Sequence, residues 1–261
     1  MKYGFIGCGN MGGAIVKALC KSTRDIVVTD RSGRARALAE ALGIAYSDNA
    51  AIASSCDGIF LGVKPHMMKD MLLPLQPILQ KKKPLLITMA AGLTIRQIQE
   101  FAGCDLPVIR IMPNTPTAVG KGMIQYCCND LVTKDMLDIF LRDMAPCGHL
   151  DPLEESLIDA ASALSGCGPA YAYLFMEALA DGAVACGVPR KKAMEYAAAT
   201  LSGAAEMVLQ THQHPGELKD AVCSPGGSTI AGVHALEDKG FRGAVMDCVI
   251  AAYEKNKMLG K

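Results

Sequence analysis

Lys2-Tyr-Gly-Phe-Ile-Gly7 leads directly into Gly7-Cys-Gly-Asn-Met-Gly12, and a helical pattern then continues from about Met11 to Lys21. A short apolar strand, a GxGxxG turn and a helix, in this order, are typical of a dinucleotide-binding fold. Gly7 would permit the tight turn, Gly9 would let a pyrophosphate approach the backbone, and Gly12 would let helix and strand pack closely. The stretch therefore predicts a nucleotide-binding sheet at the amino terminus.

The end of the next strand carries two opposing signals for the choice of cofactor. Asp30 follows the apolar run from Asp25 and ends it 18 residues after Gly12. A carboxylate at this place can hold the ribose hydroxyls of NAD. Arg31, Ser32 and Arg34 follow at once, and guanidinium and hydroxyl groups suit the 2′-phosphate of NADP. The residues alone leave the choice between NAD and NADP open, and both arginines can also be read as solvated surface charges.

Strands continue to alternate with helices as far as residue 150. Because such alternation is typical of a doubly wound sheet, we expect an α/β fold with a mostly parallel sheet. Ligands of these sheets bind beyond the carboxyl ends of the strands. The turns expected at that edge are Gly7–Gly12, Val63–Pro65, Ala90–Gly92 and Met112–Thr115.

Beyond Asp151-Pro152 the strand-like runs end and helical patterns fill the chain. We therefore predict a Rossmann domain over residues 1–151 and an all-α domain over residues 152–261. The helices expected at 169–186 and 190–211 have wide apolar faces, which indicate a subunit interface. The other helices are expected at about 153–164, 217–223, 228–239 and 241–259.

A second glycine turn lies within the helical part. A helical segment stops at Ser224-Pro225, Gly226-Gly227 allow the backbone to turn, and Ser228 and Thr229 begin a new helix. The free N–H groups of such a helix start, together with two hydroxyls, could bind an anion. The alternative is a well-capped corner between two helices.

Composition excludes several classes of function. Lys plus Arg and Asp plus Glu are 26 each, so nucleic acid is a poor expectation as a partner. The eleven cysteines are scattered without metal-binding spacing, which indicates reduced thiols in a cytoplasmic protein and no metal site. We expect no signal peptide, since strand-like sequence begins at Lys2, and no membrane span, since the most apolar stretch carries Glu177 and Asp181.

Taken together, these motifs resemble those of the pyrroline-5-carboxylate reductase family, over essentially the whole chain. The resemblance implies NAD(P)H-dependent reduction of 1-pyrroline-5-carboxylate to L-proline, with a Rossmann domain followed by a helical dimerisation domain. It also implies a homodimer, which in the family often assembles further into decamers. The motifs that carry it are Phe5–Gly12, Val63–Pro65, Ala90–Gly92, Met112–Pro116, Leu164–Tyr171, His214–Gly216, Leu218–Asp220 and Ser224–Ile230.

By the same resemblance, the first turn and the sheet edge would bind the cofactor. Asp30 departs from the small or hydroxyl residue that the family often carries there, which leaves the preference for NADP over NAD open. No role is carried over to His212. The expected cofactor residues are Gly7, Cys8, Gly9, Asn10, Met11, Gly12, Asp30, Arg31, Asn49, Val63, Lys64, Ala91 and Asn114.

The second turn would hold the substrate. The backbone N–H groups and the Ser228 hydroxyl would bind the carboxylate of the cyclic imine, and the Thr229 hydroxyl would hydrogen-bond its ring nitrogen. Thr229 is thus the expected catalytic residue. The expected substrate residues are Ser224, Gly226, Gly227, Ser228 and Thr229.

Two other functions remain as alternatives. A different Rossmann reductase with a helical partner domain would need a well-placed lysine in the helical part, whereas Lys191, Lys192 and Lys219 lie in polar or terminal positions. A non-catalytic regulator that senses cofactor redox state would keep Gly7–Gly12 but would not need Thr229. Oxidation of NAD(P)H on addition of the cyclic imine separates the regulator from the enzyme.

Overall fold

The structure is a computed structural model that describes residues 1–259. It consists of two compact units, which we call the sheet unit and the helical unit. The sheet unit comprises residues 1–167 and the segment that begins at Ala252, and the helical unit is Gly168–Ala251. Composition predicts a boundary at Asp151-Pro152, whereas the sheet unit continues to Cys167 because β8 and α8 pack against β7. The functional division into domains 1–151 and 152–261 stays a prediction.

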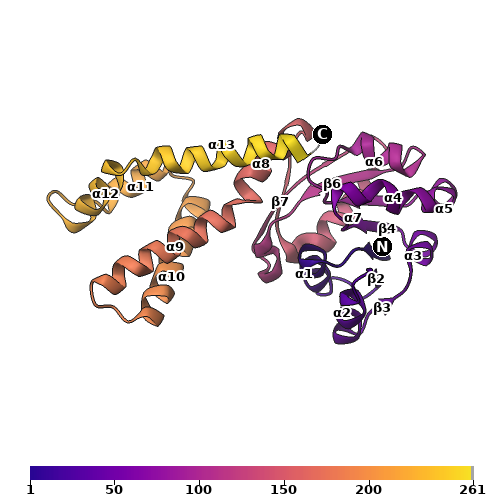
Figure 1. Cartoon of the computed structure of the whole chain (residues 1–261), viewed down its shortest axis with the longest axis horizontal. Coiled ribbons are helices and arrows are strands. Elements are labelled where there is room, and N and C mark those ends of the chain that lie inside the picture. Colours follow the sequence, from indigo (N-terminus) through magenta and orange to yellow (C-terminus); the bar gives the residue numbers. More distant parts are fainter. Residues whose placement is uncertain (260–261) are drawn as a thin grey trace. The chain divides into compact units, whose positions relative to one another are not determined.

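An eight-stranded sheet forms the centre of the sheet unit (Figure 1). Its order is β3-β2-β1-β4-β5-β6-β7-β8, and all neighbouring pairs are parallel except β6 and β7. This confirms the predicted mostly parallel α/β fold. The strands are β1 (Tyr3–Ile6), β2 (Ile26–Thr29), β3 (Ala45–Tyr46), β4 (Gly58–Leu61), β5 (Leu85–Thr88), β6 (Val108–Met112), β7 (Gly122–Cys128) and β8 (Gly148–Pro152).

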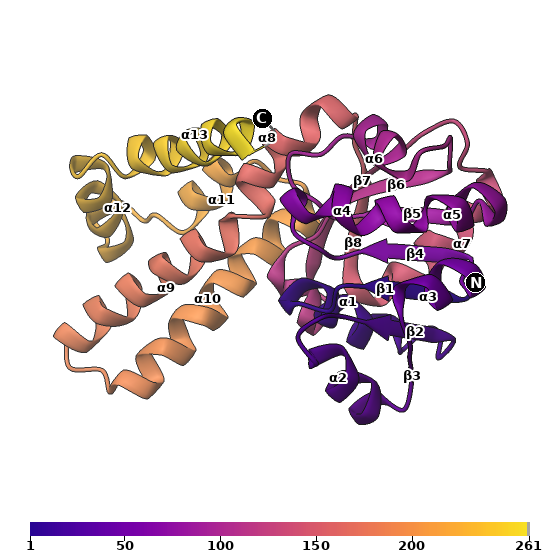
Figure 2. The same cartoon turned by 45° about the vertical axis from the view of Figure 1, so that its right-hand side comes forward.

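Helices cover both faces of this sheet, and the alternation of side chains along each strand decides which core a residue joins. Phe5 and Phe60 stack with ring centroids 4.3 Å apart in one core, whereas their neighbours Ile6 and Leu61 lie in the other. The first core is covered by α1 (Asn10–Leu19), α2 (Arg34–Leu42) and α7 (Lys134–Met144). The second is covered by α3 (Asn49–Ser55), α4 (Met68–Leu72), α5 (Gln76–Lys82) and α6 (Ile95–Ala102) (Figure 2).

The sequence prediction differs from the structure at two strands. Strands β3 and β8 were not expected, since β3 has two exposed residues and β8 is largely polar. The helical segment between β4 and β5 is divided into α4 and α5 by η2, which contains Pro74, because proline removes a backbone donor. Four short 3-10 helices lie between the other elements: η1 (Pro65–Met67), η2 (Leu73–Leu75), η3 (Thr115–Val119) and η4 (Ala145–Cys147).

The helical unit contains no strand among its described residues and buries few of its own side chains. Its only buried hydrophobic residues are Ala180, Ala193 and Ala197, where α9 and α10 pack together. Small side chains allow this close approach of the two helices. The helices after β8 are α8 (Glu155–Ser165), α9 (Gly168–Ala185), α10 (Arg190–Thr211), α11 (Pro215–Ala221), α12 (Ser228–Asp238) and α13 (Phe241–Leu259).

Two further observations concern the whole described chain. None of the helices over residues 1–259 is long and apolar enough to cross a membrane. All eleven cysteines have free thiols.

Candidate active site

The first glycine turn is tightly constrained by the backbone around it. Gly7 has a φ of +100°, and a Cβ at this position would lie 2.7 Å from the carbonyl carbon and oxygen of Gly62. A Cβ on Gly12 would lie 2.6 Å from the carbonyl oxygen of Gly7. Only glycine therefore fits either position without displacing the backbone. The roles that the sequence predicts for Gly7 and Gly12 agree with this packing.

Gly9 is different, because a Cβ there would meet nothing within 4 Å. Gly9 is exposed and precedes α1, whose first turn is not capped by any side chain. The N–H groups at the start of α1 therefore have no side-chain acceptor, and a phosphate group could accept their hydrogen bonds. This arrangement fits a pyrophosphate, because the start of the helix has free donors and the absence of a side chain at Gly9 leaves room beside them.

Cys8 lies within this turn but is not a reactive thiol. Burial, with a smaller contribution from the charge of Asp30, raises the pKa of the Cys8 thiol to about 12. The thiol therefore stays protonated at neutral pH and acts as a small apolar side chain.

The carboxylate of Asp30 organises the loop after β2. Its Oδ2 accepts a hydrogen bond from Ser32 Oγ at 2.8 Å, and its Oδ1 accepts one from the Gly33 N–H at 2.9 Å. Arg31 extends toward η1, where its Nη2 lies 3.5 Å from Met67 Sδ. The carboxylate that favours NAD and the guanidinium that favours NADP thus lie on one short loop, which ends where α2 begins at Arg34.

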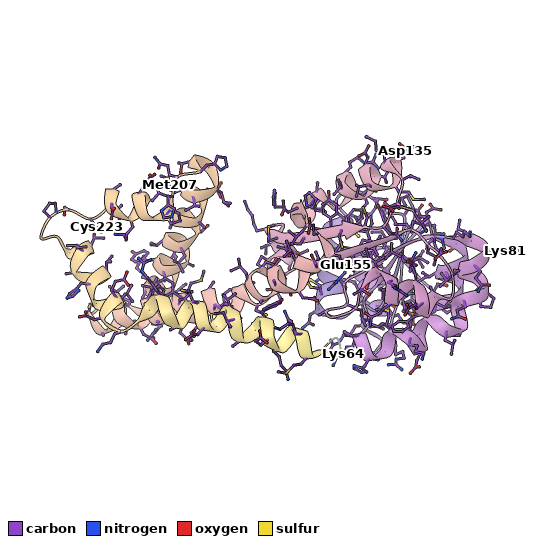
Figure 3. All side chains as sticks on the ribbon, turned by 90° about the horizontal axis from the view of Figure 1, so that it is seen from above. Lys64, Lys81, Asp135, Glu155, Met207 and Cys223 are labelled. Atoms are coloured by element: carbon purple, nitrogen blue, oxygen red, sulfur yellow. The ribbon has the colours of Figure 1, made fainter. Side chains whose placement is uncertain are left out.

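The other predicted cofactor residues follow the carboxyl ends of the neighbouring strands. The register places Ile6 beside both Thr29 and Leu61, and Leu61 beside Thr88, so the turns after these strands share one edge. Asn49 begins α3, which Asp48 caps by accepting from the Ala51 N–H at 2.8 Å. At this edge Lys64 is exposed, whereas Asn49, Val63 and Ala91 are half-buried. Figure 3 shows Lys64 at the opposite end of the sheet unit from Lys81.

Asn114 lies at the same edge, but its amide is used within the chain. Its Nδ2 donates to the Ser165 carbonyl oxygen at 2.9 Å, and its Oδ1 accepts from the Met123 N–H at 3.0 Å. The residue is 7% exposed. Asn114 therefore joins the end of β6 to β7 and to the last turn of α8, and its predicted contact with the cofactor stays a prediction.

The second glycine turn lies in the helical unit, between α11 and α12. Gly226 has a φ of +68°, and the Gly227 N–H donates to the Ser224 carbonyl oxygen at 3.0 Å. A Cβ on Gly227 would lie 2.3 Å from Ser224 Oγ. No side chain caps α12, and Ser228 and Thr229 are exposed. The turn therefore offers free N–H groups and two hydroxyls, as the sequence predicts.

Two of the five histidines serve the ends of helices in the helical unit. His214 caps α11 by accepting from the Gly216 N–H at 3.0 Å. His212 ends α10 in the left-handed conformation, with a φ of +57°. Over residues 1–259, no group of three or more His, Cys, Asp or Glu side chains could hold a metal ion.

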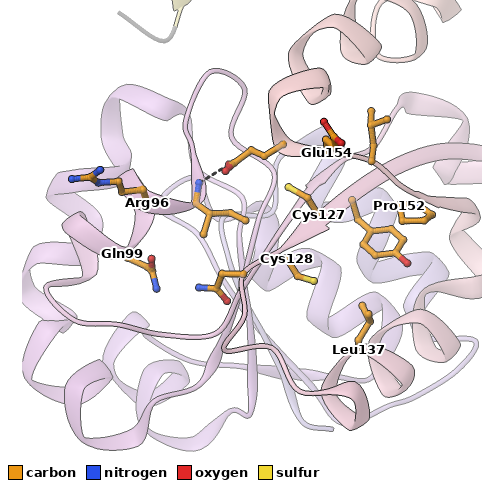
Figure 4. A pocket seen from close by; sticks show the side chains of 12 residues that line it. Arg96, Gln99, Cys127, Cys128, Leu137, Pro152 and Glu154 are labelled. Carbon is orange, nitrogen blue, oxygen red and sulfur yellow. Dashed lines mark hydrogen bonds between the residues drawn. The ribbon is translucent and has the colours of Figure 1, made fainter.

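A cavity of about 700 Å³ lies away from the predicted edge, beside the ends of β7 and β8 (Figure 4). It is open, and its lining includes Arg96 and Gln99 from α6 as well as Cys127 and Cys128 from β7. None of its lining residues is a predicted cofactor or substrate residue. Since β7 runs antiparallel to β6, its carboxyl end lies at the edge opposite the glycine turn.

Sequence reasoning missed the buried arginine of β6. Arg110 is 1% exposed and pairs with Glu155 at 3.4 Å and with Asp159 at 2.6 Å, both on α8. Glu155 also accepts from the Ile95 N–H at 2.7 Å, so one carboxylate links α6, β6 and α8. The sequence does contain a signal for this cluster, since an arginine stands inside the apolar run of β6. A buried guanidinium requires an acidic partner, so an ion pair with a carboxylate could have been predicted.

Comparison with known proteins agrees with this geometry. Residues 155–259 match the family described as pyrroline-5-carboxylate reductase dimerisation, and residues 2–92 match the family described as NADP oxidoreductase, coenzyme F420-dependent. Pyrroline-5-carboxylate reductase from Pisum sativum is 41% identical over 98% of this chain and 95% of its own length. The chain belongs to the pyrroline-5-carboxylate reductase family. This confirms the resemblance seen in the sequence.

Two further relatives extend the match. Pyrroline-5-carboxylate reductase from Escherichia coli (strain K12) is 41% identical, with 100% of this chain and 98% of the relative covered. The crystal structure of Plasmodium falciparum pyrroline carboxylate reductase with NADP bound superposes with a TM-score of 0.88 at 33% identity. That comparison covers 100% of this chain and 98% of the other. Both the amino-terminal Rossmann fold and the helical dimerisation region are thus those of the family.

Proposed function

We propose that this chain reduces 1-pyrroline-5-carboxylate to L-proline with a nicotinamide dinucleotide, NADP or alternatively NAD, as cofactor. The observation that carries the proposal is that a member of this family contains two glycine turns, each at the start of a helix that no side chain caps. One has room for a pyrophosphate at Gly9, and the other exposes Ser228 and Thr229 at an uncapped helix start. When bound, the reduced nicotinamide supplies the hydride that adds to the C=N carbon.

The first turn and the sheet edge would hold the cofactor. Free N–H groups at the start of α1 would bind the pyrophosphate, and Gly9 would let it approach the backbone. The loop after β2 would meet the adenosine ribose. Asn49, Val63, Lys64 and Ala91 would line the rest of the edge. Asn114 would also contact the cofactor there, with its amide held by hydrogen bonds to Met123 and Ser165.

The second turn would hold the substrate, which carries a carboxylate and a ring nitrogen. Backbone N–H groups over Gly226–Thr229 and the Ser228 hydroxyl would bind the carboxylate. The Thr229 hydroxyl would hydrogen-bond the ring nitrogen and thereby orient the C=N carbon. Because an imine can arrive already protonated, a hydroxyl is chemically sufficient here and no histidine is required.

The helical region would assemble the chain into a homodimer, with decamers as a further step of assembly. Support comes from the match of residues 155–259 to the dimerisation family and from exposed apolar side chains on α9 and α10. We place the reaction in the cytoplasm, because free thiols accord with a reducing compartment. The non-catalytic regulator is not favoured, since it would not need the second turn.

The test is a spectrophotometric assay of the full chain with the cyclic imine, run in parallel with NADH and NADPH. Thr229→Ala should lower turnover at least tenfold, about 1.4 kcal/mol of barrier. Thr229→Ser keeps the hydroxyl and should retain most of the activity. Absence of oxidation with both cofactors would contradict the proposed reaction, and unchanged kinetics in Thr229→Ala would remove Thr229 from the mechanism.

A further inference from the structure

Arg110 occupies a position in β6 where its neighbours on the same face, Val108 and Met112, are buried apolar residues. Its guanidinium is buried and reaches α8 with both terminal nitrogens: Nη1 lies 3.4 Å from Glu155 and Nη2 lies 2.6 Å from Asp159. The Nε of Arg110 has no hydrogen-bond partner among the described residues. Burying a guanidinium with one unsatisfied N–H is costly, and an apolar side chain would fill the same place at less cost. Stability therefore does not explain the arginine, and its contacts point to a role in positioning.

One connection runs from Arg110 to the turn after β5. Glu155, in the first turn of α8, accepts from Arg110 and also from the Ile95 N–H at 2.7 Å (Figure 4, dashed line). Ile95 is the first residue of α6, and an N–H at the start of a helix has no partner within that helix. Glu155 therefore fixes the point where α6 begins. Ala91, a predicted cofactor residue, lies in the turn that leads from β5 to this point.

A second connection runs from Arg110 along α8 to the end of β6. Asp159, one turn after the start of α8, accepts from Arg110 Nη2. At the last turn, the Ser165 carbonyl oxygen accepts from Asn114 Nδ2 at 2.9 Å, and the Ser165 hydroxyl donates to Gln125 on β7 at 2.9 Å. Both ends of α8 are thus bonded to the sheet. Arg110 holds one end, and the predicted cofactor residue Asn114 is bonded to the other.

Ala91 and Asn114 lie on one side of the glycine turn, and the loop after β2 lies on the other. In the sheet, β2 is on one side of β1, whereas β4, β5 and β6 follow on the opposite side. A dinucleotide whose pyrophosphate binds after β1 and whose adenosine lies over β2 extends its second half across β4 to β6. In a nicotinamide cofactor, this half carries the reacting ring. Both connections from Arg110 therefore end beside the reacting half of the cofactor.

We propose that Arg110 is a positioning residue for the nicotinamide half of the cofactor, and that it acts through Glu155 and Asp159. The inference rests on the proposed function only in taking a nicotinamide dinucleotide as the cofactor. Arg110 itself stays inside the sheet unit and does not contact the cofactor. Its removal frees the starts of α6 and α8, whereas the adenosine half, which depends on Gly7–Gly12 and the loop after β2, keeps its place.

The test compares a reporter for each half of the cofactor in Arg110→Met and in the wild type. The full chain is titrated with NADPH and with NADH, and the cofactor that binds more tightly is used. Fluorescence of the bound reduced nicotinamide reports the surroundings of that ring. The Kd of the matching fragment, 2′,5′-ADP for NADPH or 5′-AMP for NADH, reports the adenosine half.

We expect Arg110→Met to lose at least half of the change in fluorescence that the wild type shows on binding. The Kd of the adenosine fragment should stay within threefold. Methionine is apolar and unbranched, so it can fill the buried space. The side chains of Glu155 and Asp159 are 34% and 32% exposed, so both carboxylates remain solvated when the arginine is removed.

The matched control is Arg142→Met, which removes an arginine paired with the buried Asp143 of α7 at 2.9 Å. Asp143 also accepts from the Tyr3 hydroxyl at 3.1 Å, and Tyr3 begins β1 at the edge opposite the glycine turn. This variant should leave both readouts unchanged. Should Arg110→Met not fold, Glu155→Ala takes its place under the same thresholds. It removes the bond to Ile95 and leaves Arg110 paired with Asp159.

Three results would overturn the proposal. The first is that the variant that folds keeps more than half of the fluorescence change, or that the wild type shows no change on binding. The second is a fragment Kd that rises more than threefold, because the loss would then extend to the adenosine half. The third is an equal loss of fluorescence change in Arg142→Met, because any broken ion pair would then have the same effect.

The outcome is separable from that of the proposed reaction. If the fluorescence changes as expected and no cyclic imine is reduced, the reaction fails and the role of Arg110 stands. If the imine is reduced and the fluorescence does not change, only the role of Arg110 falls. Where the imine is reduced, Arg110→Met should lower kcat at least tenfold and leave KM for the cofactor within threefold, because the ring is misplaced while the adenosine half still binds. A smaller fall in kcat would also overturn the proposal.

Discussion

The sheet unit and the helical unit differ in how far each completes its own core. In the sheet unit, two clusters of large side chains are closed by helices on both faces of the sheet. In the helical unit, the buried hydrophobic residues are three alanines, while Leu174 is 70% exposed and Leu209 is 68% exposed. Because exposed apolar patches of this kind mark interaction surfaces, we expect the helical unit, and not the sheet unit, to pack against a partner subunit.

The two predicted binding turns show the same difference. The turn at Gly7 lies against the backbone of Gly62, so closely that no side chain would fit between them. The turn at Gly226 lies between two helices, and a Cβ there would meet nothing within 4 Å. The predicted cofactor turn is thus shaped by the fold of the sheet unit, whereas the order of the predicted substrate turn is expected to depend on assembly.

The largest expected effect comes from placing a charge on the apolar face of α9. Leu174→Asp should keep the proposed dimer from forming and reduce reductase activity at least a hundredfold, because assembly would bury the new charge without a partner, which is strongly destabilising. Light scattering on a sizing column and the imine assay measure the two effects. Leu73→Asp is the matched control, since Leu73 is 55% exposed in the sheet unit. If both variants behave alike, the contrast between the units is wrong.

Particular residues explain which parts of this architecture the sequence predicts. The GxGxxG turn is local, so the position of Gly7, Gly9 and Gly12 is predictable from spacing alone. The bounds of α10 are also as predicted, at Arg190–Thr211, because Pro189 marks its start. Local signals of this kind specify single elements, and they also locate both glycine turns.

Long-range pairing is what the sequence left unresolved. The reversed direction of β7 depends on its pairing with β6, which no local pattern reveals. Strand β3 has only two residues, both exposed, and is defined by its pairing with β2. The link from Arg110 to Asp159 spans 49 positions, and the hydrogen bonds of Asp30 and Asn114 likewise become visible only in three dimensions. The predicted binding roles of the individual site residues remain predictions.

The next largest effect separates two roles of glycine in the first turn. Gly7 is expected to be required for packing, and Gly9 is expected to be required for access of the cofactor. Gly7→Ala should destabilise the protein by about 2 kcal/mol or more, because a Cβ 2.7 Å from Gly62 and a φ of +100° are both unfavourable. Gly9→Ala should change stability by less than about 0.5 kcal/mol, since no atom lies within 4 Å of its Cβ. It should nevertheless weaken NADPH binding at least tenfold.

Denaturant unfolding and calorimetric titration with NADPH measure the two properties separately. Gly33→Ala, which is also in open space but has a φ of +81°, serves as a control for backbone strain without packing. Loss of stability in Gly9→Ala equal to that in Gly7→Ala would show that both glycines serve the fold. Unchanged NADPH affinity in Gly9→Ala would exclude a close approach of the pyrophosphate at this position.

The smallest expected effect concerns a feature that both units contain, a helix that ends at a non-glycine residue with a positive φ. Lys83 ends α5 with a φ of +49° in the sheet unit, and His212 ends α10 with a φ of +57° in the helical unit. Left-handed backbone is costly for residues with a Cβ, so Lys83→Gly and His212→Gly should each stabilise their helix by about 0.5–1 kcal/mol. The reverse change, Gly43→Ala at the end of α2, should cost about 1 kcal/mol, since its φ is +64° and its surroundings are open.

Calorimetric unfolding of these variants asks whether the units melt together. If the assembled protein unfolds in one transition, both glycine variants should raise the same Tm by similar amounts, because the gain is shared by the whole cooperative structure. If the helical unit opens first, His212→Gly should raise only the lower transition and Lys83→Gly only the upper one. A third outcome is a single transition whose Tm is raised by Lys83→Gly but not by His212→Gly. This would mean that the end of α10 is held by contacts with another molecule, and a second copy of the chain would be the first to examine.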